Sequence, residues 1–323
     1  MKCSNVLVVG GAGFIGRHVL NQLAAQGISA TVPARRRERA KHLILLPTVD
    51  VVETDIADPG VLEALAARSD AVINLAGVLH SRPAGPASGA GERFGQDFFE
   101  AHVELPQRIV SACRVAGVKR LIHMSALGAS RTAASEYLRS KGAGEELVMA
   151  AEDLAVTVFR PSVVFGPEDR FLNLFAKLAA VSPVLAVASP EARFQPVYAG
   201  DVAQAIVRSL NERDAIGKVY DLCGPQEYSL RELVKYVGRL GGRRRLVVGL
   251  GPGLSWLQAA VLERLPGKLL TRDNLLSMRH PSVGSVPLPF GIAGTSLEAV
   301  VPLYLAHAAP RERLGELRHK AHR

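Results

Sequence analysis

The chain has few cysteines, few aromatic residues and no long apolar run. Its three cysteines, Cys3, Cys113 and Cys223, are far apart and odd in number, which argues against a disulfide framework or a cysteine-based metal site and fits a reducing compartment. No apolar stretch reaches the ~18 residues of a membrane span, and a strand pattern begins too early for a secretion signal. We therefore expect a cytoplasmic protein without a bound metal.

Acidic residues are fewer than basic ones, 30 against 39, and the formal net charge is +9. The positive charge gathers at residues 35–41, 243–245 and 311–323. No zinc knuckle, recognition-helix pattern or alternation of basic and aromatic residues accompanies it, so nucleic acid is not an expected partner. An acidic protein or an anionic membrane surface stays open as a partner.

The most informative stretch is a glycine-rich turn near the amino terminus. Apolar residues 6–9 precede Gly10, Gly13 and Gly16, and an amphipathic helix pattern over 14–26 follows. This spacing allows a tight turn, close approach of the backbone to a pyrophosphate, and close packing of helix on strand. The helix N-terminus would direct its free N–H groups at the phosphates. The sequence thus predicts a dinucleotide site at Gly10, Gly13, Phe14, Ile15, Gly16 and Arg17.

The residues after the second predicted strand, 28–32, indicate which dinucleotide binds. NAD-preferring sites place an acidic residue about 20 positions beyond the glycines to bind the ribose 2′-hydroxyl. Here Arg35 and Arg36 stand at that place, and a guanidinium binds phosphate oxygens bidentately. Arg17 could reach the same 2′-phosphate. NADP(H) is therefore expected in preference to NAD(H), with a solvated basic loop as the alternative reading of these arginines.

Two further contacts are expected at the carboxyl ends of strands, the binding edge of such sheets. Asp55 and Ile56 follow the third strand, where a turn of this kind meets an adenine ring. Ala76 and Gly77 follow the fourth, where small residues let ribose and phosphates lie against the backbone. For Asp55, capping of a helix near Pro59 is the alternative.

Strand and helix patterns alternate over 5–160, which predicts an α/β fold with a doubly wound parallel sheet of Rossmann type. We expect an NADP(H)-binding domain over 1–165 and a smaller C-terminal α/β lobe for a substrate or partner over 166–323, with some later elements returning to the first sheet. The predicted strands are 5–9, 28–32, 49–53, 71–75, 119–124, 154–160, 184–188, 217–222 and 245–249. The predicted helices are 14–26, 36–44, 59–68, 97–117, 136–151, 170–180, 200–211 and 229–240, the last capped by Ser229.

Two segments leave alternatives open. Residues 80–95 hold small residues and prolines with little to bury, as in a mobile loop that serves as a substrate lid or is a tolerated insertion. Residues 250–265, with Trp256, are apolar on one side. They predict either a core helix or an interfacial one.

Three polar residues suggest acid–base chemistry. Tyr137 and Lys141 are four apart in a predicted helix and share a face. A nearby ammonium lowers the pKa of a phenol, which lets tyrosine exchange a proton with a substrate. Ser125 follows the fifth strand, where its hydroxyl could orient a carbonyl oxygen. Lys141 could also hold the nicotinamide ribose.

In this order, these motifs resemble the short-chain dehydrogenase/reductase superfamily in its extended or atypical branch, which includes nucleotide-sugar epimerases, dehydratases and NADP-dependent reductases. The resemblance extends from the glycine motif to Asp201-Val-Ala203. It implies catalytic roles for Ser125, Tyr137 and Lys141 on a small-molecule substrate that the sequence leaves unknown. The segment 160–166 resembles the one that meets the nicotinamide, which implies contacts from Pro161 and Val164.

A narrower resemblance covers nearly the whole chain. Tyr137-Leu-Arg-Ser-Lys141, the segment 165–171 and the segment 270–275 are similar to the NADPH-binding accessory subunit of respiratory complex I, the alpha-subcomplex subunit nine family, and its bacterial relatives. The resemblance implies a bound nucleotide that is structural rather than turned over, a respiratory-complex partner and a place peripheral to the inner membrane. A working oxidoreductase, epimerase or dehydratase is the rival reading.

The chain departs from the superfamily pattern at two places. His102 stands where many members carry an asparagine of the proton relay, and it either relays protons or only packs. Gly142 and Gly144 interrupt the helix of Tyr137, at a cost of about 1 kcal/mol each relative to alanine. They allow a close approach of the cofactor or a partner, or they loosen the helix.

Overall fold

The computed structural model describes residues 3–82, 94–242, 245–265 and 268–306. The predicted loop over 80–95 lies mostly outside the described residues, as do the basic segment 311–323 and two of the arginines at 243–245. The chain divides into two compact units: residues 1–162, 199–222 and 284–293 form the first, and the rest the second. Within the described residues, no helix combines the length and the apolar character that crossing a membrane requires.

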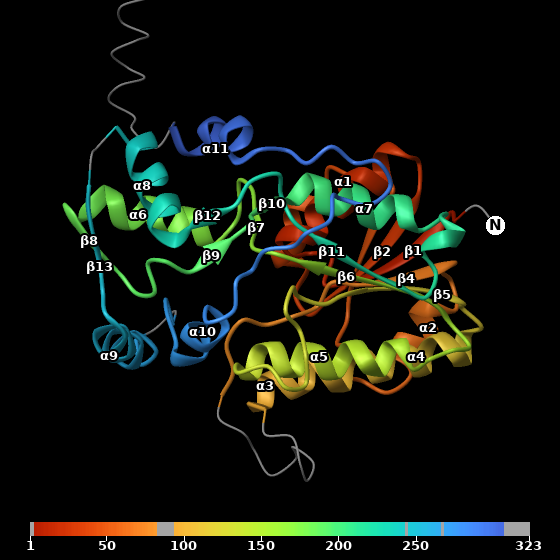
Figure 1. Ribbon diagram of the computed structural model, residues 1–323. Helices are drawn as coiled ribbons and strands as arrows, with labels where there is room; N and C mark the ends of the chain where they lie inside the picture. The colour runs from red at the N-terminus through yellow and green to blue at the C-terminus, as the bar shows by residue number, and fades with distance from the viewer. Residues whose placement is uncertain (1–2, 83–93, 243–244, 266–267, 307–323) are drawn as a thin grey trace, which may run out of the picture. The chain divides into compact units, whose positions relative to one another are not determined.

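A seven-stranded sheet forms the centre of the first unit (Figure 1), and all its neighbouring strands are parallel. The strand order is β11-β6-β5-β4-β1-β2-β3. Successive strands run outward from β1 on one side and from β4 on the other, which is the doubly wound Rossmann arrangement predicted from the sequence. The strands are β1 (Asn5–Val9), β2 (Ser29–Ala34), β3 (Val49–Glu53), β4 (Ala71–Asn74), β5 (Arg120–Met124), β6 (Ala155–Pro161) and β11 (Lys218–Leu222).

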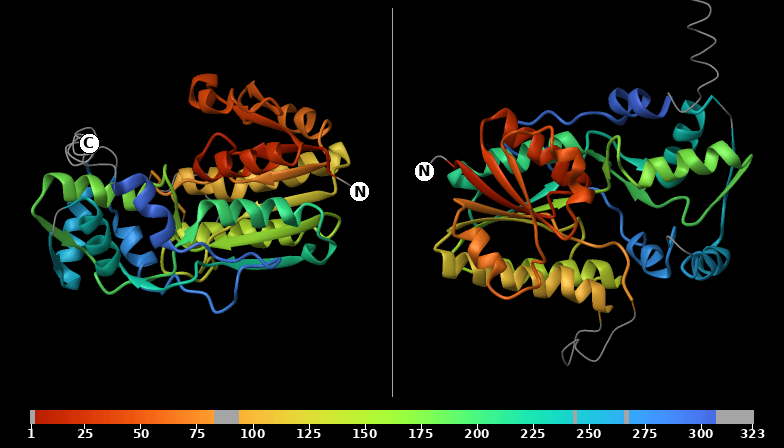
Figure 2. Two further views of the ribbon diagram at one scale, coloured as in Figure 1. Left: turned by 90° about the horizontal axis from the view of Figure 1, so that it is seen from above. Right: turned by 180° about the vertical axis from the view of Figure 1, so that it is seen from behind.

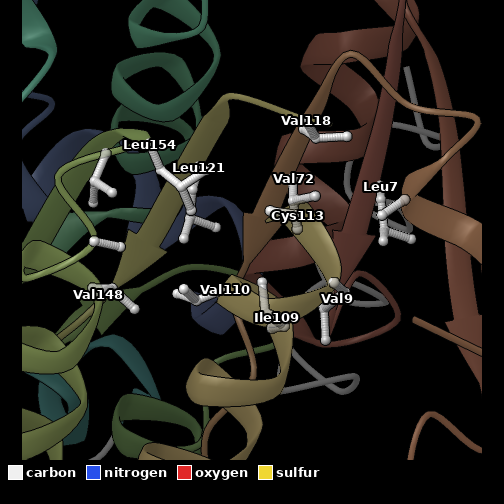
Figure 3. Packing of buried hydrophobic residues seen from close by; sticks show 14 of the residues in the cluster. Leu7, Val9, Val72, Ile109, Val110, Cys113, Val118, Leu121, Val148 and Leu154 are labelled. Atoms are coloured by element: carbon white, nitrogen blue, oxygen red, sulfur yellow. The ribbon is translucent and has the colours of Figure 1, made fainter. Parts of the chain in front are cut away.

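Helices cover both faces of this sheet, so its central strands are apolar on both sides. Figures 1 and 2 show α1 (Phe14–Ala25) and α7 (Ala199–Ser209) on one face, and α2 (Val61–Ala66), α4 (Leu105–Ala116) and α5 (Glu136–Met149) on the other. Between the sheet and this second group of helices, Leu7, Val72 and Leu121 of the strands pack with Ile109 and Val110 of α4 (Figure 3). This core fixes the carboxyl ends of the strands, where the site residues stand.

All six strands predicted over 5–160 occur, but two predicted helices differ. The segment predicted as a helix over 36–44 is a 3-10 helix, Arg37–Leu43. It buries Ala40 and Leu43, three residues apart, and three residues complete one turn of a 3-10 helix. The helix predicted over 97–117 is divided into α3 (Gln96–Phe99), a π-helical turn η2 (Glu100–Glu104) and α4.

The second unit consists of short strand pairs and helices around its own apolar core. Phe165, Leu172, Leu233, Val234 and Val301 are among the residues of this core. Helix α8 begins as predicted at Ser229, whose hydroxyl accepts the N–H of Glu232 in a capping box. The strands are β7 (Val164–Phe165), β8 (Val184–Val187), β9 (Arg193–Phe194), β10 (Val197–Tyr198), β12 (Tyr228–Ser229) and β13 (Leu246–Gly249). The helices are α6 (Phe171–Val181), α8 (Leu230–Leu240), α9 (Pro252–Leu262), α10 (Arg272–Ser277) and α11 (Leu297–Leu305).

The chain crosses between the two units several times. It leaves the first unit after Ser162 and re-enters it for residues 199–222, which form α7, the short 3-10 turn Arg213–Ala215 and β11. β11 completes the sheet by pairing with β6, with Lys218 opposite Thr157. The second unit is therefore built from three separate segments of the chain.

Candidate functional site

The glycine turn after β1 is shaped by close backbone contacts. Gly10 has φ +83°, a conformation that costs glycine little. A Cβ at Gly10 would lie 2.8 Å from the backbone nitrogen of Ala76, and one at Gly16 would lie 2.3 Å from the carbonyl oxygen of Gly11. Side chains are thus excluded at both positions, so the turn keeps its backbone bare on the edge of the sheet where β1 and β4 end.

Helix α1 begins directly behind this turn with free N–H groups. Its N-cap, Gly13, has no side chain to cap the helix, and the first turn holds no acidic residue. The first N–H groups of a helix have no partner within the helix. Phe14, Ile15 and Gly16 therefore offer backbone donors, at the positive end of the helix dipole, to an anion.

Arginines stand at the tip of the neighbouring strand, β2. Arg35 and Arg36 follow Ala34 directly and are exposed, and the next acidic residue is Glu38. Glu38 pairs with Lys41 at 3.5 Å. The structure thus offers two exposed guanidinium groups directly after β2, ahead of Glu38 in the chain.

Asp55, in the turn after β3, does not have the helix-capping role that was one of its two predicted roles. Asp55 Oδ1 accepts the N–H of Ala57 at 2.9 Å, whereas α2 begins at Val61 with Gly60 as its N-cap. Asp55 therefore shapes a local turn and does not cap the helix. Ile56 packs against the core below the sheet.

A buried polar pair holds the turn after β4. Asn74 Oδ1 accepts the N–H of Ala76 at 3.1 Å, and its Nδ2 donates to Nδ1 of His123 at 3.2 Å. His123 stands opposite Asn74 on β5, and burial lowers its pKa to about 3, so its ring is neutral. The sequence reasoning assigned no role to the side chain of either residue, although polar side chains at the ends of two otherwise apolar strands were a signal.

Lys141 meets this turn from α5. A Cβ at Gly77 would lie 3.1 Å from Lys141 Nζ, so the glycine makes room for the ammonium group. Lys141 Nζ donates to the carbonyl of Met124 at 3.1 Å, and burial lowers its pKa to about 8. The structure thus brings the predicted residues Gly77 and Lys141 together.

Tyr137 lies one turn before Lys141, as predicted, but its environment differs from the expectation. Its ring packs against Phe98 and His102, with centroids 6.1 and 5.7 Å away. Burial raises the pKa of the phenol to about 12. The expectation that Lys141 lowers this pKa is not met, because burial penalises the phenolate.

Ser125 is fully buried at the end of β5. Its backbone N–H donates to the carbonyl of Phe159 at 2.7 Å, but its Oγ has no hydrogen-bond partner within the described part of the chain. Buried hydroxyls are nearly always paired. An unpaired Oγ in this place is therefore available to a polar atom of a ligand.

His102 holds the site together as a neutral ring. Its Nε2 accepts the N–H of Val78 at 3.1 Å, so Nδ1 carries the proton and donates to Ser140 Oγ at 2.8 Å. Ser140 in turn donates to the carbonyl of Tyr137 at 2.8 Å. Burial lowers the pKa of His102 to about 2. Of the two alternatives for this residue, the structure favours packing, since both ring nitrogens are engaged.

The two glycines of α5 allow close approach of neighbours. A Cβ at Gly144 would lie 1.8 Å from the carbonyl oxygen of His102, and one at Gly142 would lie 2.6 Å from the carbonyl carbon of Ser130. Both are therefore packing positions against the chain's own backbone, which is neither the approach of a cofactor or partner nor the loosened helix that the sequence offered.

The two residues expected at the nicotinamide end fall in different units. Pro161 ends β6 in the first unit, where its carbonyl accepts the N–H of Leu127 at 3.0 Å. Val164 begins β7 in the second unit and pairs with Val197 of β10. The other predicted site residues all belong to the first unit.

A parallel doubly wound sheet, a bare glycine turn at its switch point and an uncapped helix behind that turn define the Rossmann class of nucleotide-binding fold. Within this class, the chain belongs to the NAD dependent epimerase/dehydratase family, which matches residues 6–223.

Curated relatives include a subunit of NADH dehydrogenase and a reductase. The chain is 36% identical over 236 residues to the mouse (Mus musculus) mitochondrial NADH dehydrogenase [ubiquinone] 1 alpha subcomplex subunit 9, covering 71% of this chain and 59% of the relative. It is 36% identical over 203 residues to the ceramide reductase of Caulobacter vibrioides, covering 62% of this chain and 59% of the relative. The matches thus span about three-fifths of each relative.

Solved structures show the same fold. UDP-glucuronic acid 4-epimerase from Bacillus cereus, solved with UDP-glucuronic acid and NAD, superposes with a TM-score of 0.64 at 18% identity and covers 85% of this chain and 100% of its own. At this identity the likeness extends to the fold alone.

Proposed function

We propose that the first unit binds NADP(H) and retains it as a structural part of the protein. The observation that carries this proposal is the bare backbone edge formed by Gly10 and Gly77, at which any Cβ would meet the Ala76 backbone or Lys141. A side chain at Gly10 would push apart the closely packed turns after β1 and β4, whose tight geometry a dinucleotide site of this kind requires. The uncapped start of α1 supplies N–H donors beside it.

Each group of residues has a role in this proposal. The amides of Phe14, Ile15 and Gly16 bind the pyrophosphate beside Gly13, whose own N–H donates to the carbonyl of Gly10. Arg17, Arg35 and Arg36 bind the 2′-phosphate. Asp55 and Ile56 contact the adenine, and Ala76 and Gly77 the central ribose and phosphates. Lys141 binds the nicotinamide ribose, and Pro161 contacts the nicotinamide.

A structural role for the nucleotide fits the state of the acid–base groups. A tyrosine that exchanges protons near neutral pH needs a pKa close to that range, whereas burial raises the pKa of Tyr137 to about 12. His102 is held by hydrogen bonds at both ring nitrogens. We propose, by analogy with the complex I subunits, a respiratory-complex partner and a cytoplasmic location peripheral to the inner membrane.

One observation favours a second function, that of an active NADP-dependent oxidoreductase or a nucleotide-sugar epimerase or dehydratase. The buried Oγ of Ser125 lacks a partner among the described residues and could donate to a substrate carbonyl. Tyr137 would then exchange the substrate proton, and Lys141 would hold the nicotinamide ribose. The nicotinamide, when bound, supplies or accepts the hydride.

Two measurements separate these functions. Native mass spectrometry of the purified chain should show co-purified NADP(H) that exchanges slowly with added nucleotide. NADPH oxidation across a panel of aldehydes and ketones, and epimerisation of UDP-sugars, should be absent for the wild type and for Tyr137→Phe alike. Turnover by the wild type that falls about 10²-fold or more in Tyr137→Phe, with nucleotide affinity retained, would establish the enzyme instead.

A further inference from the structure

An apolar face of the second unit is exposed. Helix α9 buries only Ser255 and Ala259, and Ala259 packs with Ala188 and Leu275. On its other side, Leu257 and Val261 are 59% and 53% exposed, and Leu265, just beyond the helix, is 48% exposed. The prediction that residues 250–265 form a core helix is thus wrong for most of the large side chains of this segment.

The exposed side chains form one stripe. Leu254, Leu257, Val261 and Leu265 follow each other at intervals of three and four residues, the spacing that places side chains on one helical face. Alternate residues of the strands β8 and β13, including Val184 and Leu246, are also exposed. Gln258 Nε2 donates to the carbonyl of Ala186 at 3.0 Å, which joins α9 to β8 (Figure 1).

Basic residues border the stripe. Between residues 245 and 279 the sequence holds five basic residues and two acidic ones. One of the acidic residues, Glu263, is paired with Arg272 at 2.7 Å. The Arg272 guanidinium also lies 5.6 Å from the ring centroid of Trp256, while Arg264 and Arg279 are exposed. Arg264, just beyond the end of α9, and Arg272, beside Trp256 of α9, therefore form a positive rim next to the apolar stripe.

We propose that α9 docks on the surface of a lipid bilayer with anionic headgroups. Leucines and a tryptophan beside basic residues are what an interfacial helix inserts among headgroups, and the positive rim is complementary to anionic lipid. A second copy of the chain fits less well, because a two-fold contact would set like-charged rims against each other. The proposal concerns the second unit and does not depend on turnover of the nucleotide.

The chain carries its own probe for this docking, since Trp256 is its single tryptophan. Vesicles of phosphatidylcholine with phosphatidylglycerol should co-sediment the full-length protein and shift Trp256 emission to the blue, and vesicles of phosphatidylcholine alone should do so weakly. The double variant Leu257→Asp with Val261→Asp should lose vesicle binding by about tenfold or more. Arg264→Gln with Arg279→Gln should weaken binding to anionic vesicles by about fivefold per side chain.

A matched control tests whether any exposed apolar residue matters. Val115 of α4 is 75% exposed and belongs to the first unit, so Val115→Asp should keep full vesicle binding. NADPH affinity should be unchanged in every variant, which shows that each is folded. The proposal is overturned if anionic vesicles change neither sedimentation nor emission, or if Val115→Asp loses binding equally. It is also overturned if the emission is already blue-shifted without lipid and Leu257→Asp converts a dimer to a monomer, which would assign the stripe to a second copy.

Discussion

At the scale of single residues, the site depends on where side chains are absent as much as on where they are present. Gly10, Gly77 and Gly144 each stand where a Cβ would strike a neighbour. The spacing of the first glycine motif predicted its role, because a glycine turn between a strand and a helix has a known geometry. The role of Gly144 could not be predicted, since it depends on the carbonyl of His102, which belongs to an earlier helical segment.

We expect Arg36→Ala to lower the affinity for NADPH by about tenfold or more, because it removes a charge-assisted hydrogen bond to the 2′-phosphate. Affinity for NADH should stay unchanged. Fluorescence titration with both nucleotides measures the ratio, and Arg39→Ala, in the same exposed basic segment, serves as the control. Equal losses of affinity for NADPH and NADH would contradict a role of Arg36 in binding the 2′-phosphate.

Gly144→Ala should destabilise the protein by about 1–3 kcal/mol, the usual cost of overpacking, because the methyl group would meet the carbonyl oxygen of His102. Gly253→Ala, in α9, meets open space and should be neutral or stabilise by about 0.4–1 kcal/mol. Chemical denaturation gives both values. A stable Gly144→Ala variant would mean that α5 and η2 are not held this closely.

At the scale of elements, the alternating pattern predicted the sheet because every central strand is covered by helices on both faces. The same reasoning failed for the helix over 97–117, which contains the π-helical turn that carries His102. No local pattern signals this turn, since its histidine is held by Val78 and Ser140 from other segments. The raised pKa of Tyr137 was missed for a related reason, because burial among Phe98 and His102 is a product of packing.

The two buried histidines should make the first unit sensitive to acid. Burial lowers the folded-state pKa of His102 to about 2 and of His123 to about 3, from the ordinary 6.5. Their contribution to stability is thus complete above pH 6.5 and is lost as the pH falls toward 3, by at most about 1.4 kcal/mol per pH unit for each ring. The free energy of unfolding measured between pH 7 and 4 should fall accordingly.

His123→Gln should flatten this pH dependence, because glutamine can still accept from Asn74 and does not titrate. His280→Gln, at an exposed position, should leave the slope unchanged. A slope that is the same in all three proteins would show that His123 is not buried as a neutral ring.

At the scale of the whole molecule, each of the two units carries a different functional feature. The first carries the glycine turn and the buried His102, and the second carries the exposed stripe of α9. The family could be recognised from sequence because its motifs lie within the matched range, 6–223, and mostly within the first unit. The interleaving of the units was harder to predict in detail, because β11 pairs with β6 across an intervening segment, 163–198, that belongs to the second unit.

The central claim is that the first unit binds the phosphorylated nicotinamide nucleotide. Isothermal titration calorimetry on the full-length chain, freed of co-purified nucleotide, tests it most directly. The account predicts one site per chain and a Kd for NADPH at least about tenfold below that for NADH. Absence of heat with both nucleotides, or a Kd for NADH equal to or below that for NADPH, would contradict it.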